Sequence, residues 1–101
     1  MSTYIILANW TDQGIRAVKD SAKRLDAGRA ALEAVGGEIR AFFMTMGGYD
    51  MVTVMTAPDD AAVARYILSL GRQGNLRTQT LKAFDEAEYR RLIGSLQVSA
   101  A

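Results

Sequence analysis

Apolar residues recur along this chain with two spacings, and each spacing predicts a different kind of element. A nearly continuous apolar run over residues 3–9 predicts a buried strand. Over residues 13–35 the apolar positions are three, four or seven residues apart, which predicts one apolar stripe along a helix. Ser21 lies inside this stretch and can start a new helical segment, so the pattern leaves open whether the helix is kinked there.

The middle of the chain predicts a β-hairpin. Residues 38–46 and 49–57 are rich in β-branched, aromatic and methionine side chains, and they flank Gly47 and Gly48. A glycine pair is typical of a tight primed turn, because glycine adopts positive φ angles at little cost. Alternate residues place apolar side chains on both faces of the hairpin. One group is Phe43, Val52 and Val54, and the other is Phe42, Met44, Met46, Tyr49, Met51 and Met55.

The last part of the chain predicts a helix, a strand and a shorter helix. Residues 58–60 (Pro-Asp-Asp) favour a helix start, and residues 62–70 carry the apolar stripe of that helix. Residues 75–82 alternate and contain two threonines, which predicts a strand more polar than the others. Residues 85–88 have the Asp-x-x-Glu spacing of a capping box, which predicts a terminal helix.

The predicted element order is therefore β-α-β-β-α-β followed by a terminal helix. Short connections and right-handed crossovers make this a ferredoxin-like α+β sandwich, in which a four-stranded antiparallel sheet carries two helices on one face. With 101 residues, the chain is expected to form a single domain over residues 1–101.

The sheet face away from the helices is expected to be apolar. A monomer rarely leaves an apolar patch larger than a few hundred square ångströms in water. We therefore expect a second copy of the chain to cover this face, sheet against sheet, in a dimeric α/β-barrel-type homo-oligomer that can enclose a pocket. The residues expected on this face are Tyr4, Ile6, Ala8, Phe42, Met44, Met51, Met55 and Leu81.

Composition removes several classes of function. The chain has no Cys and no His, which excludes disulfides, Ser-His-Asp and Cys-His nucleophiles and the usual zinc and haem ligands. The acidic residues lack metal-ligand spacing, so we expect neither a metal nor a cofactor. A net charge of +1 and the lack of a basic stripe argue against nucleic acid. No apolar run is long enough for a signal core or a membrane span, so a cytoplasmic protein without a membrane partner is expected.

Five short motifs follow one another from the first predicted strand to the last. They are Asn9-Trp10-Thr11-Asp12-x-Gly14-Ile15, Lys19-Asp20-Ser21-x-Lys23-Arg24, Gly37, Thr45-Met46-Gly47-x-Tyr49-Asp50 and Gly74-Asn75-x-Arg77-Thr78-x-Thr80. With these motifs the chain resembles the GYD family, named for the triplet at residues 48–50, over nearly its whole length. The resemblance implies a ferredoxin-like fold of the dimeric α/β-barrel type, and it implies no particular reaction.

Tyr49, Asp50 and Asn9 are the candidate catalytic residues. Tyr49 and Asp50 follow the glycine pair with side chains on opposite faces, and Asn9 ends the first predicted strand. In a shared cavity, Tyr49 or Asp50 can move a proton while the Asn9 amide stabilises a developing oxyanion. The competing interpretation is structural, with Asp50 accepting hydrogen bonds from turn amides and Tyr49 packing at the rim.

Four further residues are candidates for ligand binding. Trp10 can stack on a flat aromatic ligand, or it can simply close the end of the barrel. Arg40 and Arg77 can hold a carboxylate between them if both point inward, or they can reach solvent or pair with an acid. Thr78 offers a hydroxyl on the last strand, which the polarity of an edge strand also explains.

A basic cluster surrounds the possible helix restart. Lys19, Lys23 and Arg24, together with Ser21, can hold an anion at a helix N-terminus. A solvated basic helix face is the more common explanation of such a cluster. Asp20 and Arg24 also have the spacing of an i,i+4 ion pair.

Two hypotheses for the function follow. The first is a small homo-oligomeric binding or structural module, with a modest apolar pocket that holds a small apolar or aromatic molecule or nothing. The second is a cofactor-independent enzyme, monooxygenase-like or isomerase-like, acting on a small aromatic or enolisable substrate. The two differ in whether Asn9, Trp10, Tyr49 and Arg77 converge on one cavity.

Overall fold

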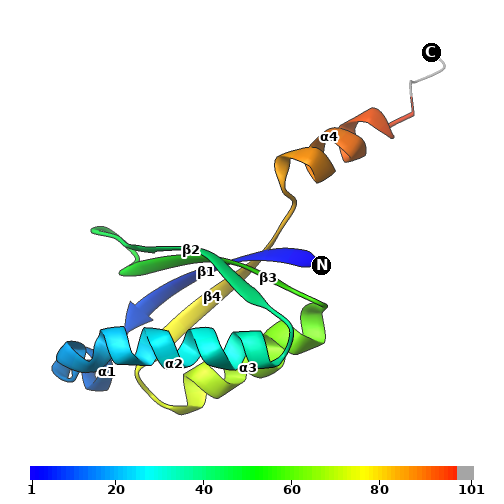
Figure 1. Cartoon of the computed structure of the whole chain (residues 1–101). Helices are drawn as coiled ribbons and strands as arrows, with labels where there is room; N and C mark the ends of the chain where they lie inside the picture. The colour runs from blue at the N-terminus through cyan, green and yellow to red at the C-terminus, as the bar shows by residue number, and fades with distance from the viewer. Residues whose placement is uncertain (98–101) are drawn as a thin grey trace.

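The computed structural model describes residues 1–97, in which four antiparallel strands form one sheet with the order β2-β3-β1-β4. In chain order the elements are β1 (Ser2–Trp10), α1 (Asp12–Arg16), the short 3-10 helix η1 (Val18–Asp20), α2 (Ser21–Ala34), β2 (Glu38–Met44), β3 (Met51–Ala57), α3 (Asp60–Arg72), β4 (Leu76–Ala83) and α4 (Glu86–Gly94). Helices α1, α2 and α3 lie on one side of the sheet, and α4 projects away from it (Figure 1). The predicted ferredoxin-like α+β arrangement is confirmed.

The core lies between the sheet and helices α2 and α3. In β1, Tyr4 and Ile6 are only 2–3% exposed, and their side chains point to the helices. The register pairs Tyr4 with Met55 on β3, which places Met55 on the same face. Helix α3 begins after Asp59, whose carboxylate accepts a hydrogen bond from the Ala62 backbone N–H at 2.8 Å and so caps the helix. The buried core cluster consists of Tyr4, Ile6, Leu32, Ile39, Met55, Ala57, Val63 and Tyr66.

The expected assignment of the two sheet faces was largely wrong. Seven of the eight residues expected away from the helices belong to the helix-covered face, and only Leu81 lies on the other. Alternation predicts correctly that these seven residues share a face, and it fails only for Leu81. Because both faces of this sheet are apolar, alternation cannot say which one the helices cover. The seven residues are Tyr4, Ile6, Ala8, Phe42, Met44, Met51 and Met55.

The face without helices is nevertheless apolar, and we call it the open face. Its central side chains, on β1 and β3, are partly exposed, whereas Phe43 on β2 is 57% exposed and Leu81 on β4 is 41% exposed. The large apolar residues of the open face are Ile5, Leu7, Phe43, Val52, Val54 and Leu81. The sheet therefore has two apolar faces, as the sequence predicts. The residues expected on the open face mostly lie under the helices, and a different set forms the open face.

The connection between β2 and β3 is longer than the predicted tight turn. The strands end at Met44 and resume at Met51, so residues 45–50 form a six-residue loop. Thr45 donates its backbone N–H to the Asp50 carbonyl at 2.7 Å and closes the loop. Gly47 has a φ of +153°, which fits the requirement for glycine in this loop.

The first helical stretch is broken, which resolves the alternative that the sequence leaves open. Helix α1 ends at Arg16, and α2 restarts at Ser21 after η1. Arg24 stabilises the break, because its guanidinium donates to the carbonyl of Ala17 at 3.0 Å and to that of Gly14 at 3.4 Å. The i,i+4 ion pair expected between Asp20 and Arg24 is not among the salt bridges of residues 1–97.

Helix α4 carries an apolar stripe that nothing else among residues 1–97 covers. The predicted capping box is confirmed, because Asp85 accepts from the Glu88 backbone N–H at 2.8 Å and Glu88 accepts from the Asp85 N–H at 3.2 Å. Two residues separate α4 from β4, and the helix extends away from the body of the molecule (Figure 1). The side chains of the stripe and of the residue before the cap are 47–68% exposed. They are Phe84, Tyr89, Leu92, Ile93 and Leu96.

Candidate functional site: a pocket between helices and sheet and an open sheet face

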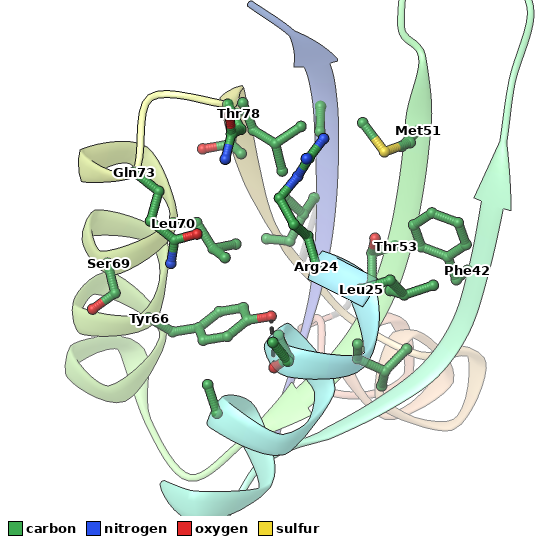
Figure 2. Close-up of a pocket in the computed structure, with 18 of the residues that line it drawn as sticks. Arg24, Leu25, Phe42, Met51, Thr53, Tyr66, Ser69, Leu70, Gln73 and Thr78 are labelled. Atoms are coloured by element: carbon green, nitrogen blue, oxygen red, sulfur yellow. Dashed lines mark hydrogen bonds between the residues drawn. The ribbon is translucent and has the colours of Figure 1, made fainter. Parts of the chain in front are cut away.

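A cavity of about 180 Å³ lies between the sheet and helices α2 and α3 (Figure 2). Its wall on the sheet side comes from β1, β2, β3 and β4, and its roof comes from the two helices. Most of the lining side chains are apolar, including Leu25, Phe42 and Leu70. The cavity adjoins the core and opens to solvent between the two helices, where Ala27, Ala31 and Ser69 of its lining are exposed.

Small side chains on α2 explain why the space stays open. Ala27, Gly28 and Ala31 line the cavity from this helix, where a filled core would carry Leu or Ile. Gly28 also lets α2 approach α3, since its carbonyl accepts a hydrogen bond from the Tyr66 hydroxyl at 3.1 Å. A Cβ atom at Gly28 would lie only 3.1 Å from that hydroxyl. The helices thus pack closely at Tyr66 and leave room beside it.

The cavity is polar at one end. Arg24 on α2 and Thr78 on β4 both line it, and Figure 2 shows both side chains at the end away from Tyr66. This end lies next to α1, because the Arg24 guanidinium bonds to the carbonyls of Gly14 and Ala17. Among residues 1–97 no salt bridge involves Arg24, so its positive charge has no carboxylate partner in the described structure.

Of the seven candidate site residues, the structure brings only Thr78 to this cavity. Asn9, Trp10 and Asp50 form a separate network where β1 ends. The Asp50 carboxylate accepts from the Trp10 backbone N–H at 3.0 Å, and the Asp50 N–H donates to the Asn9 side-chain oxygen at 3.0 Å. The indole Nε1 of Trp10 is buried without a hydrogen-bond partner in the described part of the chain. This network ties the loop after β2 to the end of β1.

The remaining candidates, Tyr49, Arg77 and Arg40, lie away from the cavity on the outer surface. Tyr49 donates its hydroxyl to Gln79 Oε1 at 2.7 Å, and Gln79 belongs to the open face of β4. Arg77 is on the same face and is exposed. Arg40 occupies a register irregularity in β2 and pairs with Glu38 of its own chain at 3.3 Å, where both side chains are more than half exposed. Arg40 and Arg77 are therefore not paired around one ligand.

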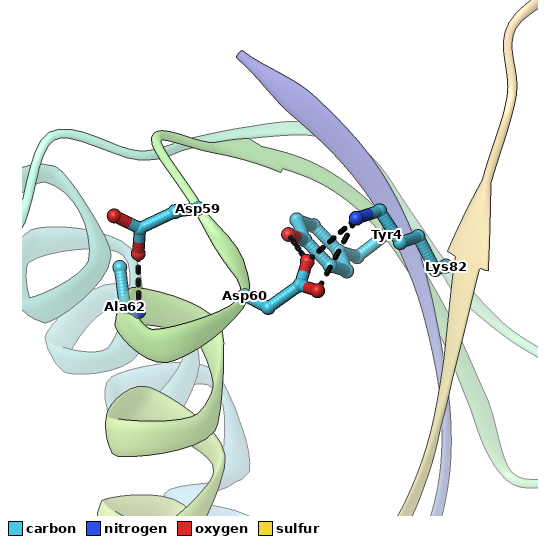
Figure 3. Close-up of polar contacts among 5 residues, drawn as sticks. All are labelled: Tyr4, Asp59, Asp60, Ala62 and Lys82. Carbon is cyan, nitrogen blue, oxygen red and sulfur yellow. Dashed lines mark hydrogen bonds and ion pairs between the residues drawn. The ribbon is translucent and has the colours of Figure 1, made fainter.

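A third polar cluster joins β1, α3 and β4 at the surface (Figure 3). The Tyr4 hydroxyl donates to the Asp60 carboxylate, and Lys82 forms an ion pair with that carboxylate at 2.9 Å. The hydrogen bond from Tyr4 and the neighbouring Lys82 hold the pKa of Asp60 below its usual range. Burial, and then the hydrogen bond to Asp60, raise the pKa of Tyr4. The cluster fixes the first turn of α3 against the sheet.

Several residues of these sites carry no local signal in the sequence. Thr53 lines the cavity from β3, although in the sequence it is only one polar residue within a strand. Gln79 contacts Tyr49, which precedes it by 30 residues, and local sequence patterns cannot predict a contact at that separation. A signal does exist for the cavity roof. Ala27, Gly28 and Ala31 place small residues along one side of α2, and that spacing indicates reduced filling of the core.

Residues 1–97 contain no helix that is long and apolar enough to cross a membrane. Within the same range there is no group of three or more Asp or Glu side chains that could hold a metal ion. These features together define a ferredoxin-like α+β protein with a cavity between helices and sheet and an uncovered apolar sheet face.

A family model for the GYD domain matches residues 4–93, and the chain belongs to the GYD family. A protein of Thermus thermophilus named glutamine synthetase and cystathionine beta-lyase binding protein is 35% identical over 89 residues, which cover 87% of this chain and 94% of the relative.

Two solved structures share the fold. One is a crystal structure of a protein from Thermus thermophilus, with a TM-score of 0.52 and 22% identity, covering 83% of this chain and 94% of the other. The second is a hypothetical protein from Pyrococcus horikoshii, with a TM-score of 0.53 and 20% identity, covering 85% and 93%. At these identities the likeness concerns the fold alone.

Proposed function

We propose that the protein is a binding module that self-associates through its open face and α4, and that it acts by contact with other proteins. The observation that carries this proposal is the pair of apolar surfaces that the described chain does not cover itself. A helix of nine residues is marginal in water without tertiary contacts. In the proposed assembly, a second chain packs against both surfaces and removes them from water.

The exposed area is of the right size for an interface. Aromatic side chains bury about 150–250 Å² each, so each half-exposed one offers about 100 Å². The open face and the α4 stripe together offer on the order of 800 Å², which is one partner's share of a standard interface. On α4 the ion pair of Glu86 and Arg90, at 2.9 Å, borders the stripe and neutralises the two charges beside it. This arrangement supports a homodimer, or a larger oligomer built from it.

The relative from Thermus thermophilus supports the second half of the proposal. Its name describes a protein that binds two enzymes. We extend to this chain only the class of partner, which is another protein. The first candidates to test are the glutamine synthetase and the cystathionine beta-lyase of the organism that encodes this chain.

The enzyme hypothesis receives no support from the geometry. Asn9 and Arg77 are register partners on the open face, where Tyr49 also bonds to Gln79, whereas Trp10 follows on the other side of the sheet. None of these four residues lines the cavity between α2, α3 and the sheet, so they do not converge on it. Their contacts favour structural roles, although the Asp50 carboxylate accepts from the Trp10 backbone N–H rather than from the turn amides that the sequence suggested.

Light scattering coupled to size exclusion tests the assembly. Wild-type protein should elute with at least twice the chain mass of 11.0 kDa. Val54→Glu on the open face and Leu92→Glu on α4 should each shift the mass toward the monomer, because burying an unpaired carboxylate is costly. The matched control is Leu68→Glu on α3, a residue that is 71% exposed and lies off both surfaces.

Monomeric wild-type protein at micromolar concentration would overturn the proposed assembly, as would variants that keep the wild-type mass. Biolayer interferometry with the two purified enzymes tests the protein partners. We expect at least one of the two enzymes to bind both the wild-type protein and the Leu68→Glu variant. If neither enzyme binds, the proposed class of partner is wrong.

A further inference from the structure

We infer that the cavity between α2, α3 and the sheet is a binding site for a small carboxylate with a compact apolar body, such as a single ring or a short branched chain. This site is separate from the open face, and nothing in the proposed protein contacts requires it. Three observations carry the inference, and they concern the shape of the cavity, its charge and its size.

The cavity is apolar over most of its wall and polar at one end. Ile6, Ile39, Phe42 and Met55 of the sheet and Leu25 of α2 form its apolar part. Thr53 adds a hydroxyl within this wall, and Thr78 adds another at the polar end. A ligand that matches this wall has an apolar body and a polar group at one end, because each polar atom placed against the apolar part would lose its hydrogen bonds to water.

The polar end carries a positive charge with spare donors. A guanidinium has five N–H groups, and the structure assigns one of them to Ala17 and one to Gly14. Those two bonds are to backbone carbonyls and hold the Arg24 side chain in place across the end of the cavity. They leave its charge uncompensated, since no described carboxylate lies within ion-pair distance. An anion that enters the cavity therefore meets a positioned cation, and a carboxylate fits the planar fork best.

Ser21 strengthens the case for an anion at this end. It begins α2 and lines the cavity together with Arg24, one turn further along. The residue before it, Asp20, forms no side-chain hydrogen bond to cap the helix. The positive end of the α2 dipole thus lies beside the Arg24 guanidinium, and both favour a negatively charged ligand group.

The volume limits the ligand to a small molecule. An apolar cavity of about 150 Å³ accommodates benzene in another protein, and the present cavity has about 180 Å³. One ring with a carboxylate group fills this space, whereas a fused ring system or a long acyl chain does not fit. Benzoate is accordingly the first probe, and benzamide is its neutral counterpart of the same shape.

Isothermal titration calorimetry of the full-length protein with these two probes tests the inference. Benzoate should bind wild-type protein in the millimolar range or tighter, and benzamide should bind at least about tenfold more weakly, since it lacks the charge that Arg24 recognises. Arg24→Gln should weaken benzoate about tenfold and leave benzamide unchanged. Lys23→Gln removes the same charge from an exposed neighbour on α2 and should leave both affinities unchanged.

A second variant keeps the test decisive if Arg24→Gln fails to fold. Thr53→Met extends a side chain into the cavity from β3 and should abolish benzoate binding, while Ala61→Met on the exposed side of α3 should not. Equal affinities for benzoate and benzamide would overturn the carboxylate assignment. No binding of benzoate by wild-type protein at millimolar concentration, or unchanged binding by Thr53→Met, would overturn the site. Because the open-face variants test a different surface, either proposal can fail without the other.

Discussion

The carboxylate of Asp50 accepts a hydrogen bond from the backbone N–H of Trp10, with 3.0 Å between Oδ2 and the nitrogen. The backbone N–H of Asp50 in turn donates to the Ala8 carbonyl at 2.9 Å. Asp50, in the loop between β2 and β3, therefore both accepts a hydrogen bond from the end of β1 and donates one to it. The Asp of the GYD triplet has a structural role here, at the point where β1 turns toward α1.

Replacing Asp50 should consequently lower stability. Asp50→Ala leaves the Trp10 N–H without its charged acceptor, which costs about 1–3 kcal/mol in the free energy of unfolding. Urea denaturation followed by circular dichroism measures the change. Asp26→Ala, at an exposed position of α2, is the control and should stay within about 0.5 kcal/mol of wild type. An Asp50→Ala protein as stable as this control would contradict the structural role.

Gly14 should tolerate no side chain. A Cβ atom there would lie 2.0 Å from the Asn75 carbonyl oxygen, a backbone atom that cannot move away without displacing the start of β4. Gly14→Ala should therefore destabilise the protein by about 2–4 kcal/mol, measured as a shift of the thermal unfolding midpoint.

The contrasting substitution is Gly71→Ala. A Cβ atom at Gly71 has open space within 4 Å, and the residue lies in the last turns of α3. Alanine should stabilise the helix by up to about 1 kcal/mol. If Gly14→Ala and Gly71→Ala changed the thermal unfolding midpoint equally, the close approach of α1 to Asn75 would be absent in solution.

The cluster of Tyr4, Asp60 and Lys82 should make stability depend on pH at the acidic end. Because the folded-state pKa of Asp60 is lowered, its contribution is present above the unfolded value of about 4 and is lost as the pH falls through the folded value. Asp60→Asn should thus lower the unfolding midpoint at pH 7, and the difference from wild type should disappear as the pH falls below the folded-state pKa of Asp60. Asp26→Asn is the control. A difference that persists unchanged at low pH would show that the charge of Asp60 is not responsible.

Tyr66→Phe should cost more stability than Tyr49→Phe. Tyr66 is 7% exposed and donates to the Gly28 carbonyl at 3.1 Å, so removing its hydroxyl should cost about 0.5–1.5 kcal/mol. Tyr49 is 37% exposed, and water can replace its bond to Gln79, so its loss should cost less than about 0.5 kcal/mol. Chemical denaturation of both variants gives the comparison, and the reverse order would contradict the assigned burial.

Local patterns predicted the elements well because the signals that define them are local. The capping box of Asp85 and Glu88 spans four residues and formed as expected. The pairing of the two hairpin strands followed from alternation. The tight turn did not form, because residues outside the hairpin hold the loop. Tyr49 bonds to Gln79, which is 30 residues further along the chain, and Asp50 bonds to the end of β1. Local sequence patterns cannot predict contacts between residues so far apart in the chain.

The candidate sites were harder to predict than the fold. The sequence offers two explanations of Arg24, an anion site at a helix N-terminus or a solvated basic face. It gives no sign that the side chain turns toward the carbonyls of Gly14 and Ala17. The enzyme hypothesis groups Asn9, Trp10 and Asp50 around a substrate, and in the structure they lie together but are joined through backbone hydrogen bonds. Chain proximity and chemical type indicate which residues meet. Only the packing of whole elements determines whether they meet around a cavity.

The register of β1 also decides where a label can be attached. Thr3 pairs with Ala83, so the start of the chain and the base of α4 leave the sheet at the same corner. The loop at Gly47 and Gly48 lies beyond the far end of β3, and an added Cβ atom meets nothing within 4 Å at either glycine. A fluorophore or an affinity peptide fused at the N-terminus crowds the base of α4, whereas one inserted between these glycines points into open solvent.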